Sequence, residues 1–176
     1  MNRITFIIEE DNDISESQYD AASRLIKKER ILTSTDNGDG TWSPTADTGQ
    51  GGGDGKITTQ KTWDKNSLLK IQTDDNSNDT EYFYDYLNRM WKTEYMPKTI
   101  YDDSTTEVLI FNDDDVVTDR TDQNLSNFDY SYDADNRLTQ ITVSSFGTGV
   151  LNMSKDQKFE YDGLSRTTKT TDSYDT

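Results

Sequence analysis

The chain lacks cysteine and histidine, and only two of its 176 residues are proline. Without a thiol or an imidazole it has neither the commonest general base nor a cysteine nucleophile, and nearly every transition-metal site is excluded. A pair of carboxylates can still hydrolyse glycosides, but 34 acidic residues single out no particular pair. The sequence therefore favours a protein that is not an enzyme and holds no cofactor.

Long apolar runs are also missing. Hydrophobic residues make up 30% of the chain, and the mean hydropathy is -0.98. No run approaches the 18 apolar residues of a membrane helix, and the stretch Ile4 to Ile8, which Thr5 interrupts, is too short for a signal-peptide core. We expect a thin apolar layer, and a segment of a longer exported protein rather than an intracellular one.

Positive charge is scarce, because 18 basic residues face 34 acidic ones and the formal net charge is -16. Such a chain repels phosphate backbones and anionic lipid surfaces. Nucleic acid and membrane insertion are therefore excluded from the expected partners.

Aromatic residues are plentiful and follow a regular pattern. In the stretch FDYSYDADNRLTQITV, residues 128 to 143, the aromatics Phe128, Tyr130 and Tyr132 occupy every second position, which is typical of a strand with one apolar face. Three residues ending in Asn136 separate this strand from a second one, as in a hairpin loop with a left-handed residue. The stretch predicts a β-hairpin.

The corner of this hairpin recurs along the chain. Four copies have Tyr-Asp followed four residues after the Asp by Arg, and a fifth begins at Trp63-Asp64 but has Leu68 in place of Arg. The residues of the repeated motif are Tyr19, Asp20, Arg24, Trp63, Asp64, Tyr84, Asp85, Arg89, Tyr132, Asp133, Arg137, Tyr161, Asp162 and Arg166.

Successive aspartates of the motif are 44, 21, 48 and 29 residues apart. The two long intervals are about twice the shortest one, which predicts that each hides a degenerate copy. The candidates are the segment from Ile100, which contains Tyr101-Asp102, and the segment around Trp42.

Each residue type has a physical role in such a corner. The aspartate can accept hydrogen bonds from the turn amides, and the arginine can pair with it while the guanidinium lies on the tyrosine ring. Serine stands at the expected left-handed position in three copies, at Ser23, Ser67 and Ser165. Because serine is poorly suited to a positive φ, we expect some of these loops to adopt another turn.

The repeated motif resembles the YD repeat of the RHS family, from about residue 14 to the chain end. The resemblance implies an all-β fold, an antiparallel sheet of repeated hairpins that curls as part of a spiral or shell. It also implies a non-catalytic structural module of a larger secreted or surface protein of bacterial type. Tc-type and polymorphic toxins of the family enclose a toxic segment, and the similar shell of teneurins serves adhesion. The expected partners are neighbouring repeats, other copies joined at edge strands, an enclosed toxin segment or a cell-surface glycan.

One segment admits two interpretations. Residues 16–32 contain good helix formers, and Ser17 with Asp20 resembles a helix capping box. The repeat instead places a hairpin here, and we favour the hairpin.

The loops show no convincing ligand site. We predict one YD-repeat segment over residues 1–176 with a flexible glycine-rich loop at about 46–56, since Lys56 is followed by Ile57 and not by the Ser or Thr of a phosphate loop. The segment from Thr35 has part of a calcium loop, but Ala46 stands where a bidentate Glu is required. A hairpin turn explains these residues more simply.

An alternative function rests on the aromatics. Trp42, Trp63, Trp91 and ten tyrosines could form an exposed face that binds carbohydrate or protein. Their alternation within strands favours packing against the inner surface of the sheet instead.

Overall fold

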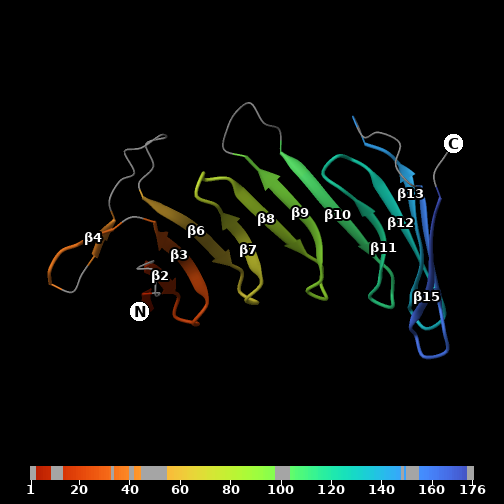
Figure 1. The fold of residues 1–176 in the computed structure, drawn as a ribbon, viewed down its shortest axis with the longest axis horizontal. Helices are drawn as coiled ribbons and strands as arrows, with labels where there is room; N and C mark the ends of the chain where they lie inside the picture. Colours follow the sequence, from red (N-terminus) through yellow and green to blue (C-terminus); the bar gives the residue numbers. More distant parts are fainter. Residues whose placement is uncertain are drawn as a thin grey trace. The chain divides into compact units, whose positions relative to one another are not determined.

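The protein is all-β. The structure, a computed structural model, describes residues 3–8, 14–32, 34–39, 42–44, 55–97, 104–147, 149 and 155–173, and every regular element in these ranges is a strand (Figure 1). Within them, no helix is long and apolar enough to cross a membrane. The strands are β1 (Arg3–Ile8), β2 (Ile14–Tyr19), β3 (Leu25–Ile31), β4 (Ser34–Asp36), β5 (Trp42–Pro44), β6 (Lys56–Trp63), β7 (Leu69–Thr73), β8 (Asp79–Tyr84), β9 (Met90–Met96), β10 (Thr105–Phe111), β11 (Val117–Thr121), β12 (Asn127–Tyr132), β13 (Leu138–Ser145), β14 (Asp156–Tyr161) and β15 (Thr167–Ser173).

Thirteen strands follow one another in a single sheet, in the order β1-β2-β3-β6-β7-β8-β9-β10-β11-β12-β13-β14-β15. Because each strand lies beside its neighbour in sequence, except where β4 and β5 are skipped, the sheet consists of consecutive antiparallel hairpins. The predicted antiparallel sheet of repeated hairpins is confirmed. Strands β4 and β5 pair in a separate two-stranded sheet, so the segment around Trp42 is not the hidden copy that the spacing suggested.

The chain divides into two compact units. Unit 1 comprises Met1–Glu81 and Met96–Asp102, and unit 2 comprises Tyr82–Tyr95 and Asp103–Thr176. In unit 1, β2 and β3 form a hairpin in which Tyr19 lies opposite Leu25. The hairpin expected over residues 16–32 is therefore confirmed, and the competing helix is wrong. Strand pairing prevails over helix propensity here because β3 is hydrogen-bonded on both sides, to β2 and to β6.

In unit 2, the alternation of the sequence becomes two different faces of the sheet. Along β12 the residues Phe128, Tyr130 and Tyr132 are half-buried, whereas the intervening Asn127, Asp129 and Ser131 are exposed. On β13, Val143, Ile141 and Leu138 lie directly opposite the three aromatics. The cross-strand contacts between these side chains stabilise the sheet.

Few side chains are fully buried. Among the described residues, Ile31 is the one buried hydrophobic side chain, at 8% exposure. Apart from Gly55, the other buried residues are polar or charged, namely Ser15, Ser17, Glu29, Thr93 and Ser126. The apolar layer is as thin as the composition predicts, so the hairpins require additional polar interactions.

The predicted glycine-rich loop at 46–56 lies outside the described residues except for its end. Gly55 has a left-handed φ of 77°, and its carbonyl accepts a hydrogen bond from Leu32 N–H at 2.8 Å. Lys56 already belongs to β6. Tyr101 and Asp102, the second candidate for a hidden copy, also lie outside the described residues.

Candidate functional site: the aspartate corners

The hairpins turn through corners of one geometry. At Asp133, the N–H of this residue donates to Arg137 O at 3.0 Å, and Asn136 N–H donates to Asp133 O at 3.1 Å. The same two backbone hydrogen bonds recur at eight corners in the described part of the chain. These corners begin at Asp20, Asp64, Asp74, Asp85, Asn112, Asp122, Asp133 and Asp162.

The side chain of the first corner residue closes the turn. One carboxylate oxygen of Asp133, Oδ1, accepts hydrogen bonds from the backbone N–H groups of Asp135 and Arg137, both at 3.0 Å. At Asn112 the amide oxygen Oδ1 accepts the same two bonds, at 2.9 and 3.2 Å. Either Asp or Asn therefore satisfies the turn amides, as in other Asx turns.

The fourth residue of every corner is left-handed. Its φ lies between 57° and 65°, and none of the eight is glycine. The expectation that serine would force another turn is wrong, because Ser23, Ser67 and Ser165 all adopt positive φ. The hydrogen bonds to the corner aspartate outweigh the intrinsic cost of this conformation. The eight residues are Ser23, Ser67, Ser77, Asn88, Asp115, Leu125, Asn136 and Ser165.

Four corners also carry an arginine that pairs with the aspartate. The second carboxylate oxygen, Oδ2, accepts a bond from the arginine Nε at 2.7 Å in Asp20–Arg24, 2.7 Å in Asp85–Arg89, 2.6 Å in Asp133–Arg137 and 2.7 Å in Asp162–Arg166. Asn112 has no second carboxylate oxygen, and Val116 stands where the others have arginine.

These hydrogen bonds shift the ionisation of the pair. The side-chain hydrogen bond from Arg137, followed by its backbone N–H, holds the pKa of Asp133 below its ordinary value. Hydrogen bonding to Asp133 in turn raises the pKa of Arg137. For Asp85, burial raises the pKa, but the hydrogen bonds from Arg89 outweigh this effect and the net pKa is lowered. Both partners therefore stay charged at neutral pH.

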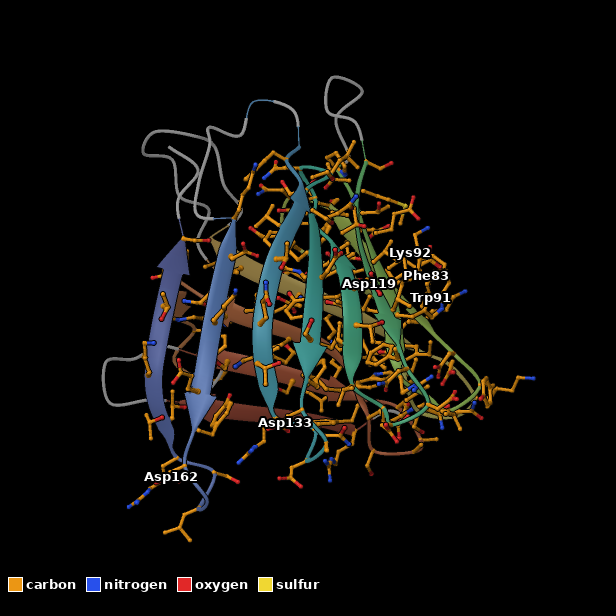
Figure 2. The ribbon with its side chains drawn as sticks, turned by 90° about the vertical axis from the view of Figure 1, so that its right-hand side faces the viewer. Phe83, Trp91, Lys92, Asp119, Asp133 and Asp162 are labelled. Carbon is orange, nitrogen blue, oxygen red and sulfur yellow. The ribbon has the colours of Figure 1, made fainter. Side chains whose placement is uncertain are left out.

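The arginine then reaches the corner of the next hairpin. Arg24 Nη1 donates to Asp64 O at 2.8 Å and to Ser67 Oγ at 3.2 Å. In unit 2, Arg137 Nη1 donates to Asp162 O at 3.3 Å and to Ser165 Oγ at 3.4 Å, and Asp133 and Asp162 lie at the same end of the sheet (Figure 2). We call this set of contacts the arginine stitch.

A third arginine stitch lies between the corners at Asp85 and Asn112. Arg89 Nη1 donates to Asn112 O at 3.3 Å and to Asp115 Oδ1 at 2.6 Å. Asp115 is the left-handed residue of that corner, so it takes the place of the serine hydroxyl in the other two stitches.

The aromatic ring beneath each guanidinium belongs to the next hairpin and not, as the motif suggested, to its own. The guanidinium carbon lies 6.0 Å from the Trp63 ring centre for Arg24, 4.8 Å from Phe111 for Arg89, and 5.1 Å from Tyr161 for Arg137. The own-ring prediction is wrong because the Asp–Arg pair directs the guanidinium across the sheet. Arg3 occupies the same position over Tyr19, at 4.6 Å.

The aromatic side chain of the next hairpin also donates a hydrogen bond back to a backbone carbonyl of the preceding hairpin. Trp63 Nε1 donates to Leu25 O at 2.8 Å, and Tyr161 OH donates to Leu138 O at 2.8 Å. Tyr132 OH makes the equivalent bond to Val117 O at 2.7 Å. Each acceptor is five residues beyond the first residue of the preceding corner, so adjacent hairpins are fixed in register.

Three corners escape the sequence motif. Asp74, Asn112 and Asp122 follow Thr73, Phe111 and Thr121, and none has an arginine four residues later. The remaining signal is an Asp or Asn that precedes a run of small polar residues between two alternating stretches. This signal is weak because the shared geometry depends on backbone hydrogen bonds that many sequences can make.

The described residues contain no group of three or more side chains suited to hold a metal ion. The incomplete calcium loop from Thr35 lies partly outside the described residues. A shallow hollow of about 310 Å³ in unit 2 is lined by both apolar and charged residues, among them Phe128, Ile141 and Arg120. The arginine stitches join neighbouring hairpins, and the result is a stitched antiparallel sheet.

Solved structures contain the same fold. The crystal structure of TcdB2-TccC3 matches 93% of this chain with a TM-score of 0.68 and 16% identity, and the crystal structure of TcdB2-TccC3-Cdc42 matches 93% with a TM-score of 0.67 and 18% identity. The Tc holotoxin pore of Photorhabdus luminescens with a TccC3 variant matches 93% at a TM-score of 0.67 and 18% identity. In each case the chain spans 8% of the length of the matched chain. No protein-family model and no curated protein matches the chain.

Proposed function

We propose that the chain is a non-catalytic structural segment of a larger secreted or surface protein of bacterial type, in which it forms part of a β-wall. The wall would enclose a toxic segment or serve adhesion. Support comes from the arginine stitches, whose groups join one hairpin to the next, and from the likeness in fold to Tc toxin structures.

The last hairpin carries the observation on which the proposal chiefly rests. Arg166 makes the usual pair with Asp162, but its side chain is 73% exposed, whereas that of Arg137 is 26% exposed. Every residue of β15 is exposed as well. We infer that this edge receives a further hairpin with an aromatic–Asp corner, either a neighbouring repeat or another copy, onto which Arg166 makes an arginine stitch.

A chain extended by one hairpin tests the proposal. A second copy of residues 146–173 is added after the chain end, and Arg166→Ala is made in both the original and the extended chain. We expect the substitution to leave the melting temperature of the original chain nearly unchanged, because an exposed ion pair contributes little. In the extended chain it should lower the melting temperature by several degrees. Equal effects in the two chains would contradict the stitched edge.

A binding module with an exposed aromatic face is the second candidate function. Trp63 is half-buried, and its N–H already donates a hydrogen bond within the sheet. Trp91, by contrast, is 39% exposed. Its surroundings favour a protein partner over a carbohydrate, for the reasons that follow.

A further inference from the structure

Five hairpins have a β-bulge just beyond the corner. In the β12–β13 hairpin, Tyr132 pairs with Leu138 but Ser131 pairs with Gln140, so Thr139 is the extra residue. Its hydroxyl donates to Ser131 O at 3.0 Å. Thr118 and Thr168 make the same bond in their hairpins, to Ile110 O at 3.3 Å and to Glu160 O at 3.1 Å. Threonine at this position thus stabilises the bulge.

The β8–β9 hairpin has a tryptophan at the position of this threonine. Trp91 follows Arg89 by two residues, as Thr139 follows Arg137. Its ring lies 6.3 Å from that of Phe83 at an interplanar angle of 57°, and Lys92 Nζ lies 4.5 Å from the centre of the Phe83 ring. Figure 2 shows the three side chains gathered together. The Trp91 side chain has no hydroxyl group, so it does not reproduce the threonine hydroxyl that bonds to the facing carbonyl in the other hairpins.

Neighbouring strands continue this apolar cluster into a row across unit 2. Val108 lies opposite Lys92, so Ile110, two residues further along β10, lies on the same face as Lys92, and Ile110 is 54% exposed. Ile110 lies opposite Asp119, and Asp119 lies opposite Asp129. We call Phe83, Trp91, Ile110, Asp119 and Asp129 the cross-strand row.

The acidic half of the row lacks a counter-charge. Like charges directly opposite each other on adjacent strands destabilise a sheet. Asp129 accepts a hydrogen bond from Ser144 Oγ at 3.0 Å, but neither Asp119 nor Asp129 makes an ion pair with any residue in the described ranges. An arginine or lysine from outside would relieve the repulsion.

We propose that the cross-strand row binds a segment of another protein that has an apolar anchor followed by a basic residue. Exposed clusters of this composition mark protein interfaces, where tryptophan is a frequent hot spot. A carbohydrate fits less well, because Ile110 has no polar group and the Lys92 ammonium already bonds to Glu94 at 2.9 Å. Adjacent strands are about 4.8 Å apart, so the apolar and acidic halves are roughly 10 Å apart, the span of three residues in an extended peptide.

The test uses the full chain and a fluorescein-labelled peptide, Leu-Ser-Ser-Arg-Ser-Arg, with Ser-Ser-Ser-Arg-Ser-Arg as its control. Fluorescence anisotropy at low salt should show at least fivefold tighter binding of the leucine peptide. Trp91→Thr, which copies the other hairpins, should abolish this preference without lowering the melting temperature. Phe83→Ser, which copies Ser131, should weaken it, and Asp119→Asn should weaken both peptides and reduce the salt dependence. Leu164→Ser, at a turn tip 75% exposed, is the matched control and should change nothing.

Two results would overturn the proposal. Equal binding of the two peptides, or no binding at millimolar peptide, would show that the apolar half anchors nothing. A shift of tryptophan fluorescence with chitohexaose that Trp91→Thr removes, without a preference between the peptides, would assign the row to a glycan.

Discussion

Leu125 is the most improbable of the eight left-handed corner residues, and replacing it with glycine should stabilise the protein. Its φ is 64° and its side chain is 63% exposed, so the substitution sacrifices little packing. A left-handed conformation costs a residue with a Cβ about 1–2 kcal/mol. Glycine also makes the unfolded chain more flexible, which lowers the free energy of unfolding by about 0.4–1 kcal/mol. The difference favours Leu125→Gly by roughly 0.5–1 kcal/mol.

Leu164 provides a matched control in an equivalent corner. It is 75% exposed, but it stands one position earlier in its corner and its backbone is not left-handed. Leu164→Gly should therefore lower the free energy of unfolding by about 0.4–1 kcal/mol, because only the entropy of the unfolded state changes. The same substitution is thus expected to have opposite signs at two exposed leucines.

Urea denaturation followed by circular dichroism measures both variants. A change of 1 kcal/mol corresponds to roughly 2–4 °C in melting temperature for a chain of this size, so thermal melting gives a second measure. Leu125→Asn should fall between leucine and glycine, since Asn tolerates this conformation better than most residues. If Leu125→Gly destabilises the protein as much as Leu164→Gly does, the left-handed strain is not the dominant cost at the corner.

Three further predictions concern the stitches. Tyr161→Phe removes the 2.8 Å hydrogen bond to Leu138 O and should lower the free energy of unfolding, measured by urea denaturation, by about 1 kcal/mol. Tyr86→Phe, at a residue that is 89% exposed, should leave it unchanged. Equal losses in the two variants would contradict a role for the Tyr161 hydroxyl. Asn112→Asp combined with Val116→Arg should install the missing arginine stitch toward Tyr132 and raise the melting temperature by about 2–4 °C. Val116→Arg alone should raise it less, because Asn112 offers the arginine no carboxylate. If the double variant gains nothing, the Asp–Arg pair does not by itself build a stitch. The pKa of Asp20, Asp133 and Asp162 lies below the ordinary 3.8 in the folded chain, so their contribution to the free energy of unfolding should be complete above pH 3.8 and decline as the pH falls through the lowered values. Asp133→Asn should therefore reduce the loss of stability at acid pH, measured by urea denaturation at a series of pH values. An unchanged dependence of stability on pH would refute this assignment.

The sequence predicts the hairpins well because their determinants are local. Alternation assigns the strands, and an aspartate four residues before an arginine encodes a complete turn within five positions. Even the ambiguous segment 16–32 follows the repeat and not its helix propensity. Corners such as Asn112 and Asp122 are missed because they keep the side-chain hydrogen bonds to the turn amides but have no arginine four residues later.

The contacts between hairpins could not be predicted in the same way. Arg137 is 25 residues from the carbonyl of Asp162 that it contacts, and the motif gives no reason to choose the ring of Tyr161 over that of Tyr132. The sequence likewise did not indicate that Trp91 is exposed while the Trp63 N–H donates a hydrogen bond within the sheet.

By itself, the sequence determined that this protein is a series of acidic hairpins with aspartate corners, because turn chemistry acts between residues a few positions apart. Only the tertiary structure decided which aromatic ring each arginine contacts, that β15 lies exposed at an edge of the sheet, and which aromatic side chain faces solvent. These depend on the lateral pairing of strands, which brings together residues that are distant in sequence.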